Sequence, residues 1–175
     1  MGERAYAIER HAGPREPLRR LFELAEDSPR QLDAYLEQGD VLVATIAGRP
    51  VGHIQCVAAG RPGELEIKNM AVDPAVQGRG IGRALVEAVL SDARRRGLAS
   101  VRVATAAADV GNLRFYQRHR FRLRSVEPDA FTPDTGYPPG LEIDGIPLRD
   151  RVWLDRALAA PRGAPEAGAH RTARP

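Results

Sequence analysis

The stretch VDPAVQGRGIGR, residues 72–83, decides the fold of this 175-residue chain. It follows a strand-like run, LEIKNMAV at 65–72, and it opens a segment with a helical apolar stripe at 81–96. Alternating glycines at a helix start let the backbone bend so that several N–H groups point at one place, where the helix dipole adds partial positive charge. The pattern therefore predicts a strand, an anion-binding loop and a helix, with a loop suited to a pyrophosphate.

The spacing within this loop narrows the kind of anion site. A P-loop needs Lys and a hydroxyl residue after its last glycine, and a dinucleotide-binding loop needs a small residue where Arg83 stands. The spacing that fits is Gln-x-x-Gly-x-Gly, formed by Gln77, Gly80 and Gly82. In this the loop resembles the acetyl-coenzyme A loop of the GCN5-related N-acetyltransferase (GNAT) family. The alternative is a glycine-rich turn without a ligand, but the flanking strand and helix favour the ligand-binding interpretation.

A second segment, NLRFYQRHRF at 112–121, supports the same resemblance. It is similar to a helix of the family in which an Asn faces the cofactor and a Tyr lies near its sulfur. Asn112 and Tyr116 are four positions apart, so a helix places them on one face. Arg120 stands where the family usually has glycine, which affects how the helix ends. The alternative for Tyr116 is an ordinary core aromatic with its hydroxyl at the surface.

The resemblance implies acetyl-coenzyme A as the cosubstrate. It places the backbone of Met70, Ala71 and Val72 along the pantetheine, where an N–H near Met70 could serve the thioester oxygen. It assigns Asn112 to the cofactor. It assigns the pyrophosphate to the loop residues Gln77, Gly78, Arg79, Gly80, Ile81, Gly82 and Arg83.

Acetyl transfer to an amine needs a base and an acid. An alkyl ammonium, with a pKa near ~10, must lose a proton before it attacks, and the departing thiolate needs a proton. Tyr116 is chemically suited to supply that proton. Glu66 matches the glutamate that some family members use as the base, directly or through water. A regular strand puts Glu66, Met70 and Val72 on one face, although a bulge would upset that count. The alternative for Glu66 is a surface ion pair with Lys68.

Acidic residues gather in two regions, 16–40 and 127–155, of a chain whose net charge is +3. In the family these regions border the acceptor cleft, so two acidic borders would attract a cationic amine. An aminoglycoside-like antibiotic or a polyamine is therefore the expected small-molecule acceptor. The segment 136–150, longer than a minimal hairpin, is a candidate lid. The alternative is ordinary surface charge. The candidate substrate residues are Asp129, Asp134, Glu142 and Asp144.

Other classes of function fit the sequence less well. The arginine-rich stretch 114–124 lacks the aromatic interleaving of a nucleic-acid module, so no nucleic-acid partner is expected. No apolar run reaches the roughly 18 residues of a membrane span, and no signal peptide is recognisable, so we expect a cytoplasmic protein with no membrane partner. The single Cys56 is interpreted as a buried small hydrophobe in a reducing compartment. No metal site is expected, because the histidines are scattered at His11, His53, His119 and His170.

The resemblance and the hydrophobic pattern together predict an α/β fold of the GNAT type. Its mixed, mostly antiparallel central sheet of about six to seven strands is flanked by about four helices. Strands are expected at 6–10, 41–47, 51–58, 65–72, 101–105, 121–126 and 152–154. Helices are expected at 16–26, 30–38, 81–96 and 112–119. The predicted domain is 1–158, and the tail 159–175 is expected to be disordered.

Three functions remain open from the sequence. The first is an acetyltransferase that modifies the amine of a small molecule. The second is a protein acetyltransferase acting on an N-terminal or lysine amine, which predicts an open groove free of the segment 131–147. The third is a non-catalytic domain that binds coenzyme A, which Tyr116 and the intact glycine loop disfavour. A homodimer is one option for the assembly.

Overall fold

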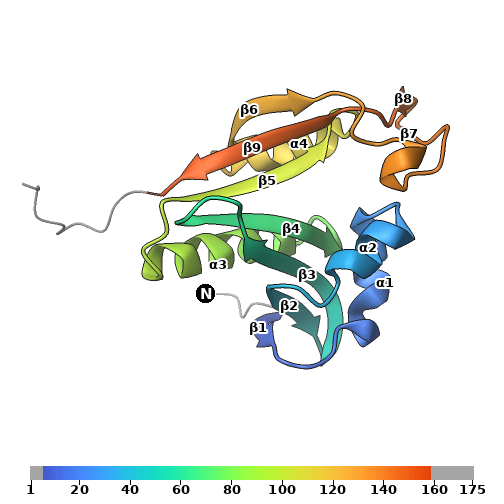
Figure 1. Cartoon of the computed structure of the whole chain (residues 1–175). Helices are drawn as coiled ribbons and strands as arrows, with labels where there is room; N and C mark the ends of the chain where they lie inside the picture. Colours follow the sequence, from blue (N-terminus) through green and yellow to red (C-terminus); the bar gives the residue numbers. More distant parts are fainter. Residues whose placement is uncertain (1–5, 159–175) are drawn as a thin grey trace, which may run out of the picture.

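The computed structural model describes residues 6–158 (Figure 1). The boundary expected after residue 158 and the disorder expected at 159–175 concern a tail that lies outside the described residues. Within 6–158, seven strands form one sheet in the order β1-β2-β3-β4-β5-β9-β6. These strands are β1 Ala7–His11, β2 Asp40–Ile46, β3 Arg49–Ala58, β4 Glu64–Val72, β5 Ser100–Ala106, β6 Arg122–Glu127 and β9 Arg151–Ala157.

Only one neighbouring pair in this sheet, β4 with β5, is parallel. The described chain also contains a small hairpin of β7 (Glu142–Ile143) and β8 (Ile146–Pro147). The α-helices are α1 Arg19–Phe22, α2 Pro29–Tyr35, α3 Ile81–Arg95 and α4 Val110–Arg118. Short 3-10 turns cover 16–18, 23–25, 74–76 and 133–135. The expected mixed, mostly antiparallel sheet with four α-helices is confirmed.

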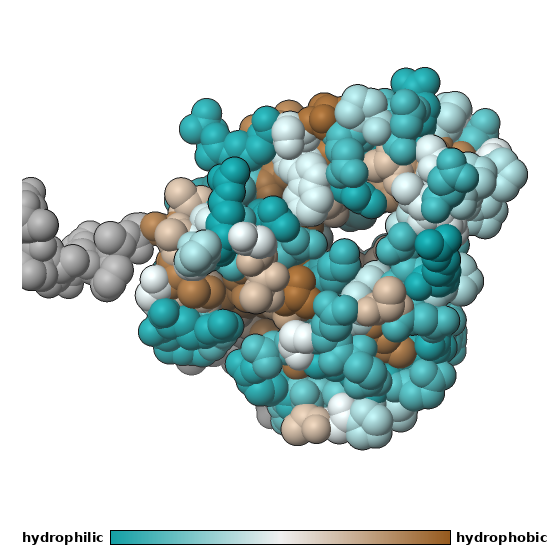
Figure 2. Space-filling model, in the orientation of Figure 1, coloured by the Kyte–Doolittle hydropathy of each residue, from teal (hydrophilic) through white to brown (hydrophobic). Residues whose placement is uncertain are grey.

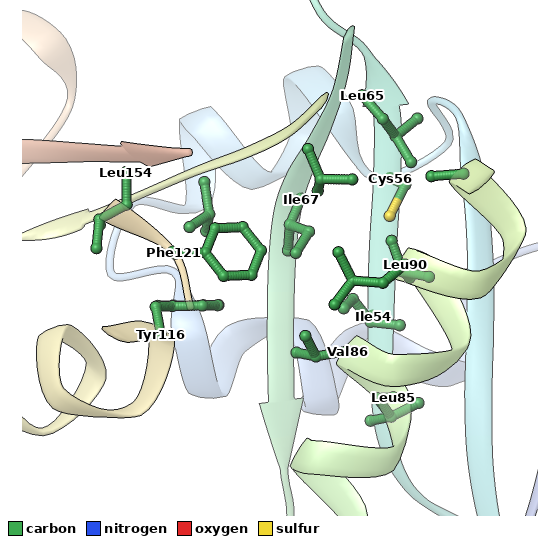
Figure 3. Close-up of a cluster of buried hydrophobic side chains, with 14 of the residues drawn as sticks. Ile54, Cys56, Leu65, Ile67, Leu85, Val86, Leu90, Tyr116, Phe121 and Leu154 are labelled. Carbon is green, nitrogen blue, oxygen red and sulfur yellow. The ribbon is translucent and has the colours of Figure 1, made fainter. Parts of the chain in front are cut away.

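The helices lie on both faces of the sheet and bury two apolar clusters. The larger cluster joins α3 and the end of α4 to one face, and Leu85, Val86 and Leu90 of α3 point at β3 and β4 (Figure 3). Tyr116 and Phe121 continue this cluster toward β9. The smaller cluster lies on the opposite face, where α1 and α2 pack against β2. Helix periodicity explains the stripe on α3, because its buried positions recur three and four residues apart.

The helix ends follow local chemistry. The Ser28 side chain caps α2 by accepting from the Gln31 N–H at 3.2 Å, and Pro29 occupies the first turn, where no N–H is needed. Helix α4 begins two residues earlier than expected, since Asp109 supplies its cap. After α4, Arg120 adopts a φ of +64°, the left-handed conformation that glycine usually takes at this position in a helix end.

The turn between β2 and β3 differs from the expectation. Arg49 and Pro50 belong to β3 rather than to the turn. Ala47 and Gly48 both have positive φ, +48° and +75°, and close a two-residue hairpin instead. This geometry matches the twist of the flanking strands, which is why two-residue hairpins favour positive φ at both positions.

The sheet opens in its middle, between β4 and β5. These strands pair only from Glu64 with Ser100 to Ile67 with Val103. Immediately beyond that point β4 has a one-residue bulge, because Lys68 has no partner on β3 while its two neighbours pair normally. Past the bulge, the ends of β4 and β5 diverge (Figure 1). This divergence makes room for a site between two halves of one sheet.

Candidate functional site

A cavity of about 900 Å³ occupies the space where β4 and β5 separate. Figure 2 shows the molecule hollowed between the part that carries β5, β9 and β6 and the part that carries β1 to β4. One end of the cavity reaches the loop before α3, and the other reaches the α1–α2 connection and the segment before β9. We call the first the cofactor end and the second the acceptor end.

The cofactor end presents unpaired backbone amides. Gly78 and Gly80 have φ values of +78° and +79°, and a side chain built on either glycine would meet open space. The N–H groups of residues 78–83 have no acceptor among the described residues, and no side chain caps α3. Free amides at the start of a fifteen-residue helix, together with its dipole, are a site for a diphosphate.

Most of the residues that the sequence assigned to the cofactor line this cavity. They are Met70, Ala71, Val72, Gln77, Gly78, Gly80, Ile81, Gly82, Arg83, Asn112 and Tyr116. Arg79 is not among the lining residues. The Gln77 side chain turns back to the strand, where its Nε2 donates to the Val72 carbonyl at 3.0 Å. Gln77 thus braces the loop against β4.

The backbone at the end of β4 faces the cavity. The Asp73 N–H donates to the Val51 carbonyl at 2.8 Å, which makes Asp73 and Val51 a hydrogen-bonded pair of the β3–β4 ladder. Such pairs alternate along an antiparallel ladder. The peptide groups of Val72 and Met70 therefore point away from β3, toward the side where β5 has diverged. This exposes an N–H at Met70 to the cavity.

Tyr116 combines burial with access to the cavity. The residue is only 5% exposed, and its ring contacts the rings of Phe115 and Phe121 edge-on, with centroids 5.2 and 5.5 Å away. Burial raises the pKa of the Tyr116 hydroxyl, so that this group stays protonated at neutral pH. Its hydroxyl has no hydrogen-bond partner within residues 6–158. Tyr116 can therefore act as a proton donor to a group in the cavity.

Asn112 lies near Tyr116 but is held by a residue that the sequence interpretation missed. Its side-chain amide donates to Asp109 Oδ2 at 2.7 Å, and its backbone N–H donates to Asp109 Oδ1 at 2.8 Å. Asp109 also lines the cavity. An Asp three positions before a polar residue at a helix start is the usual signature of an N-cap, and that signal could have identified it.

Glu66 lines the cavity between two cations. Arg102 donates to Glu66 Oε2 through Nε at 3.0 Å and Nη2 at 2.6 Å. The Lys68 ammonium lies 3.9 Å from Oε1, so the ion pair with Lys68 considered from the sequence is present. The Arg102 guanidinium in turn stacks over the Trp153 ring, 4.7 Å from its centroid. The carboxylate of Glu66 is therefore neutralised by two basic side chains.

The bulge at Lys68 corrects the face count for β4. Ile67 before the bulge, and Met70 and Val72 after it, all pack against the cluster beneath α3. Glu66 alternates with Ile67 and so faces the other side of the sheet from Met70 and Val72. The expectation that these three residues share a face is wrong, because a bulge shifts the alternation by one residue.

The acceptor end has different acids from those expected. The structure places none of the four candidate substrate residues, Asp129, Asp134, Glu142 and Asp144, among the lining residues. Asp129, for example, is exposed and lies 3.8 Å from the Arg149 guanidinium. The acids that do line this end are Glu26 and Asp27, from the connection between α1 and α2. Both belong to the acidic region 16–40 that was expected to border the acceptor cleft, although the helix expected at 16–26 ends before Glu26.

The segment 131–148 forms one wall of the acceptor end. Its apolar side chains line the cavity, and Phe131 and Tyr137 meet edge-on with ring centroids 4.9 Å apart. The segment is attached to α2, since Gln31 Nε2 donates to the Thr135 carbonyl at 2.7 Å. The segment, which contains most of the candidate lid 136–150, therefore lines one side of the acceptor end.

The sequence of this chain matches the model of one protein family. The sequence model of the acetyltransferase (GNAT) family matches residues 4–121, more than half of the chain. This chain belongs to the GNAT family. The uncharacterized N-acetyltransferase YvbK of Bacillus subtilis is 31% identical over 137 residues, which span 77% of this chain and 86% of YvbK.

Solved GNAT structures share the fold closely. An IAA acetyltransferase from Bacillus cereus is 31% identical with a TM-score of 0.79, and the match covers 87% of this chain and 99% of that one. A GNAT acetyltransferase from Elizabethkingia anophelis, solved with acetyl-coenzyme A bound, is 26% identical with a TM-score of 0.81 and covers 89% and 100%. The present GNAT protein is an acetyl-coenzyme A-dependent N-acetyltransferase.

Two further features of this GNAT domain bear on what it binds. Within residues 6–158, no group of three or more His, Cys, Asp and Glu side chains is arranged to hold a metal ion. In the same range, no helix is both long and apolar enough to cross a membrane. The free amides of 78–83 fit the diphosphate of acetyl-coenzyme A, since each is a donor without a partner in the described chain.

Proposed function

We propose that this GNAT protein transfers the acetyl group directly to a primary amine of a small acceptor, with both substrates bound at once. The observation that carries the proposal is the single cavity that joins the free amides of 78–83, Tyr116 and an acidic acceptor end. An acetyl-enzyme on cysteine finds no support. The only cysteine, Cys56, does not line the cavity, and burial raises the pKa of its thiol to about 12.

The proposed reaction conserves protons as follows. The acceptor ammonium gives one proton to a carboxylate, and the free amine forms a C–N bond with the thioester carbon. The C–S bond then breaks, and the sulfur takes the proton of the Tyr116 hydroxyl. The nitrogen loses its second proton, which restores the Tyr116 hydroxyl, and the carboxylate releases its proton to water. A backbone N–H at Met70 donates to the thioester oxygen as its negative charge develops.

A small acceptor fits the site better than a protein chain. A protein acetyltransferase would need an open groove, whereas the segment 131–148 contributes Phe131, Tyr137, Ile143 and Leu148 to the wall of the cavity. Attraction of a cationic amine now rests on Glu26 and Asp27, since the four acids chosen from the sequence lie elsewhere. Aminoglycosides and polyamines remain candidate acceptors on this basis, beside monoamines with an apolar body. The proposed location is the cytoplasm.

The test is release of free thiol from acetyl-coenzyme A by the purified protein in the presence of an amine panel. The panel holds aminoglycosides, polyamines, aromatic monoamines, amino acids and a lysine peptide. It also holds IAA, the compound named for the Bacillus cereus relative. A small amine with saturable, stoichiometric thiol release supports the proposal. Turnover with the peptide alone would replace it with protein acetylation. Acetyl-coenzyme A binding without turnover on any amine would favour a non-catalytic domain.

A further inference from the structure

We infer that Glu26, rather than Glu66, is the carboxylate that binds the acceptor ammonium and removes its proton. The inference deepens the proposed function and rests on it. Glu26 lies in the connection between α1 and α2, is half-buried and lines the acceptor end of the cavity. No regular element or sequence motif marks it, and its assignment depends on a chain of buried hydrogen bonds behind it.

The partners of Glu26 are neutral donors. Its Oε1 accepts from the Ser28 N–H at 3.0 Å, and its Oε2 accepts from the Tyr35 hydroxyl at 3.1 Å. Within residues 6–158 no Lys or Arg forms an ion pair with it. The carboxylate is thus positioned by hydrogen bonds while its negative charge remains uncompensated, which is the condition for attracting an ammonium ion.

Buried residues fix the direction of the hydrogen bond from Tyr35. Asn69 Nδ2 donates to the Phe22 carbonyl at 3.2 Å and to the Tyr35 hydroxyl at 2.8 Å. The Tyr35 oxygen therefore accepts from Asn69, and its own proton is left to be donated to Glu26. Asn69 is in turn oriented by His53, whose Nε2 lies 2.8 Å from Asn69 Oδ1. Since Oδ1 is an acceptor, His53 must carry its proton on Nε2.

This series of hydrogen bonds, from His53 through Asn69 to Tyr35, is rigid because its side chains are buried. His53 is 0%, Asn69 4% and Tyr35 5% exposed, and the Phe22 ring stacks on His53 with centroids 3.9 Å apart. Hydrogen bonds between buried groups hold side chains in one arrangement, because breaking one leaves an unpaired polar atom. His53 and Asn69 therefore fix the position of Tyr35, and the Tyr35 hydroxyl holds Glu26.

Glu66 has the opposite electrostatics. A substrate ammonium near Glu66 would also meet the Arg102 guanidinium and the Lys68 ammonium, both already paired with that carboxylate. Like charges at this range repel, so the two cations that neutralise Glu66 disfavour an ammonium ion beside it. Glu66 is then a residue that positions Arg102 and Lys68, while Glu26 keeps its negative charge for the substrate.

The charged and titratable groups around Glu26 come from its own connection, α2, the segment 131–148, β4 and β9. Tyr35 lies on α2, and Tyr137, whose pKa is raised by burial and then by the charge of Glu26, lies on the covering segment. Asp27 follows Glu26 in the chain and is exposed. Two cations also line the cavity: Lys68 on β4, 5.0 Å from the centroid of the Tyr35 ring, and Arg151 on β9, whose charge acts on Tyr137. Lys68 is paired with Glu66 and Arg151 with Glu127, so an entering ammonium group meets its unpaired acid at Glu26.

The first test compares Glu26→Gln with the matched variant Glu66→Gln at saturating acetyl-coenzyme A. We expect Glu26→Gln to lower kcat/KM for the amine about 100-fold at pH 7, and the loss to shrink at pH values where the amine is already neutral. Glu66→Gln should keep the parent's pH profile. An equal or larger loss in Glu66→Gln, or a loss in Glu26→Gln that does not depend on pH, would overturn the inference.

A second measurement does not depend on turnover. Calorimetry of 2-phenylethylammonium binding to the protein–coenzyme A complex should give a clear affinity for the parent and about a 10-fold weaker one for Glu26→Gln. Tyr35→Phe, which removes the positioning hydroxyl but keeps the ring, should fall between them. Equal affinity in parent and Glu26→Gln, or no binding to the parent, would contradict the inference. Failure of the proposed function would appear separately, as absence of thiol release from the parent with every amine.

Discussion

The two ends of the cavity are built in different ways. The cofactor end consists mainly of backbone N–H groups within one stretch of chain, 77–83, and the peptide groups of Met70 and Val72. The acceptor end consists of side chains from the α1–α2 connection, β4, the segment 131–148 and β9. A site made of backbone depends on turn and helix geometry, which a short sequence can specify. A site made of distant side chains depends on how the whole domain packs.

Tyr116 lies where the two ends meet, and its substitution should have the largest effect. Tyr116→Phe removes the proton donor to the departing thiolate while it keeps the ring in its apolar cluster. We expect kcat to fall roughly 1000-fold, as loss of a general acid typically produces. Acetyl-coenzyme A affinity, measured by calorimetry, should stay within about twofold, because the diphosphate is expected to bind the backbone amides of 78–83, which we call the cradle. A parent-like kcat would remove the acid role from Tyr116.

The protein should lose stability in acid, because the buried His53 behind the acceptor end must stay neutral. Burial lowers the pKa of His53 from 6.5 to about 4. As the pH falls below 6.5, the unfolded chain takes up the His53 proton before the folded protein does. The stability contributed by neutral His53 is therefore complete above pH 6.5 and is lost between pH 6.5 and 4, by about 3 kcal/mol.

Urea unfolding between pH 4 and 7 measures this loss in the parent and in His53→Gln, and the difference between them isolates His53 from the other titrating groups. His119→Gln, which changes a more exposed histidine outside the cavity, is the control. Burial also lowers the pKa of His119, so we expect a slight flattening in the His119 variant and a clearly flatter slope in His53→Gln. A slope in His53→Gln equal to that of the parent would assign the acid sensitivity to other residues.

The backbone character of the cofactor end can be tested with two matched glycines. Gly80 in the cradle and Gly48 in the β2–β3 turn have φ values of +79° and +75°, and an added Cβ meets open space at both. Alanine should strain both turns by about 1–2 kcal/mol. Only Gly80→Ala should weaken acetyl-coenzyme A binding, by about tenfold, since only that turn aims amides at the ligand. Calorimetry measures the affinity of both variants for acetyl-coenzyme A. Equal affinities would mean that the backbone geometry at Gly80 does not contribute to binding.

The smallest effect on acetyl-coenzyme A binding is expected from Gln77, whose side chain holds the loop against β4. Gln77→Ala removes the hydrogen bond to the Val72 carbonyl, which holds the loop against β4. Because this bond is exposed, its loss should weaken acetyl-coenzyme A binding only about threefold. Gln117→Ala removes a comparable 3.1 Å bond to the Leu113 carbonyl away from the cavity and should leave affinity unchanged. A large loss in Gln77→Ala would mean that its amide contacts the ligand itself.

The accuracy of the sequence interpretation follows the same division. The seven strands of the sheet, the long helix α3 and the glycine loop before it were all predicted close to their observed positions, because periodicity and turn residues are local signals. The face of Glu66 was predicted wrongly, since a bulge at Lys68 leaves no mark in the sequence. The four acids chosen from 127–155 do not line the acceptor end, whereas Glu26 and Asp27 come from the other acidic region, 16–40, because charge density along the chain does not show which of its acids face inward.

By itself, the sequence predicted the GNAT fold, the glycine loop before α3 and a tyrosine on the helix at 112–119, because periodicity, turn residues and motif spacing are local signals. Tertiary structure alone decided that Arg102 and Lys68 neutralise Glu66 and that the Tyr35 hydroxyl, held by Asn69, donates to Glu26. The physical reason is that a hydrogen bond or an ion pair depends on distance in space, and the pairs that distinguish these two carboxylates join different strands and helices.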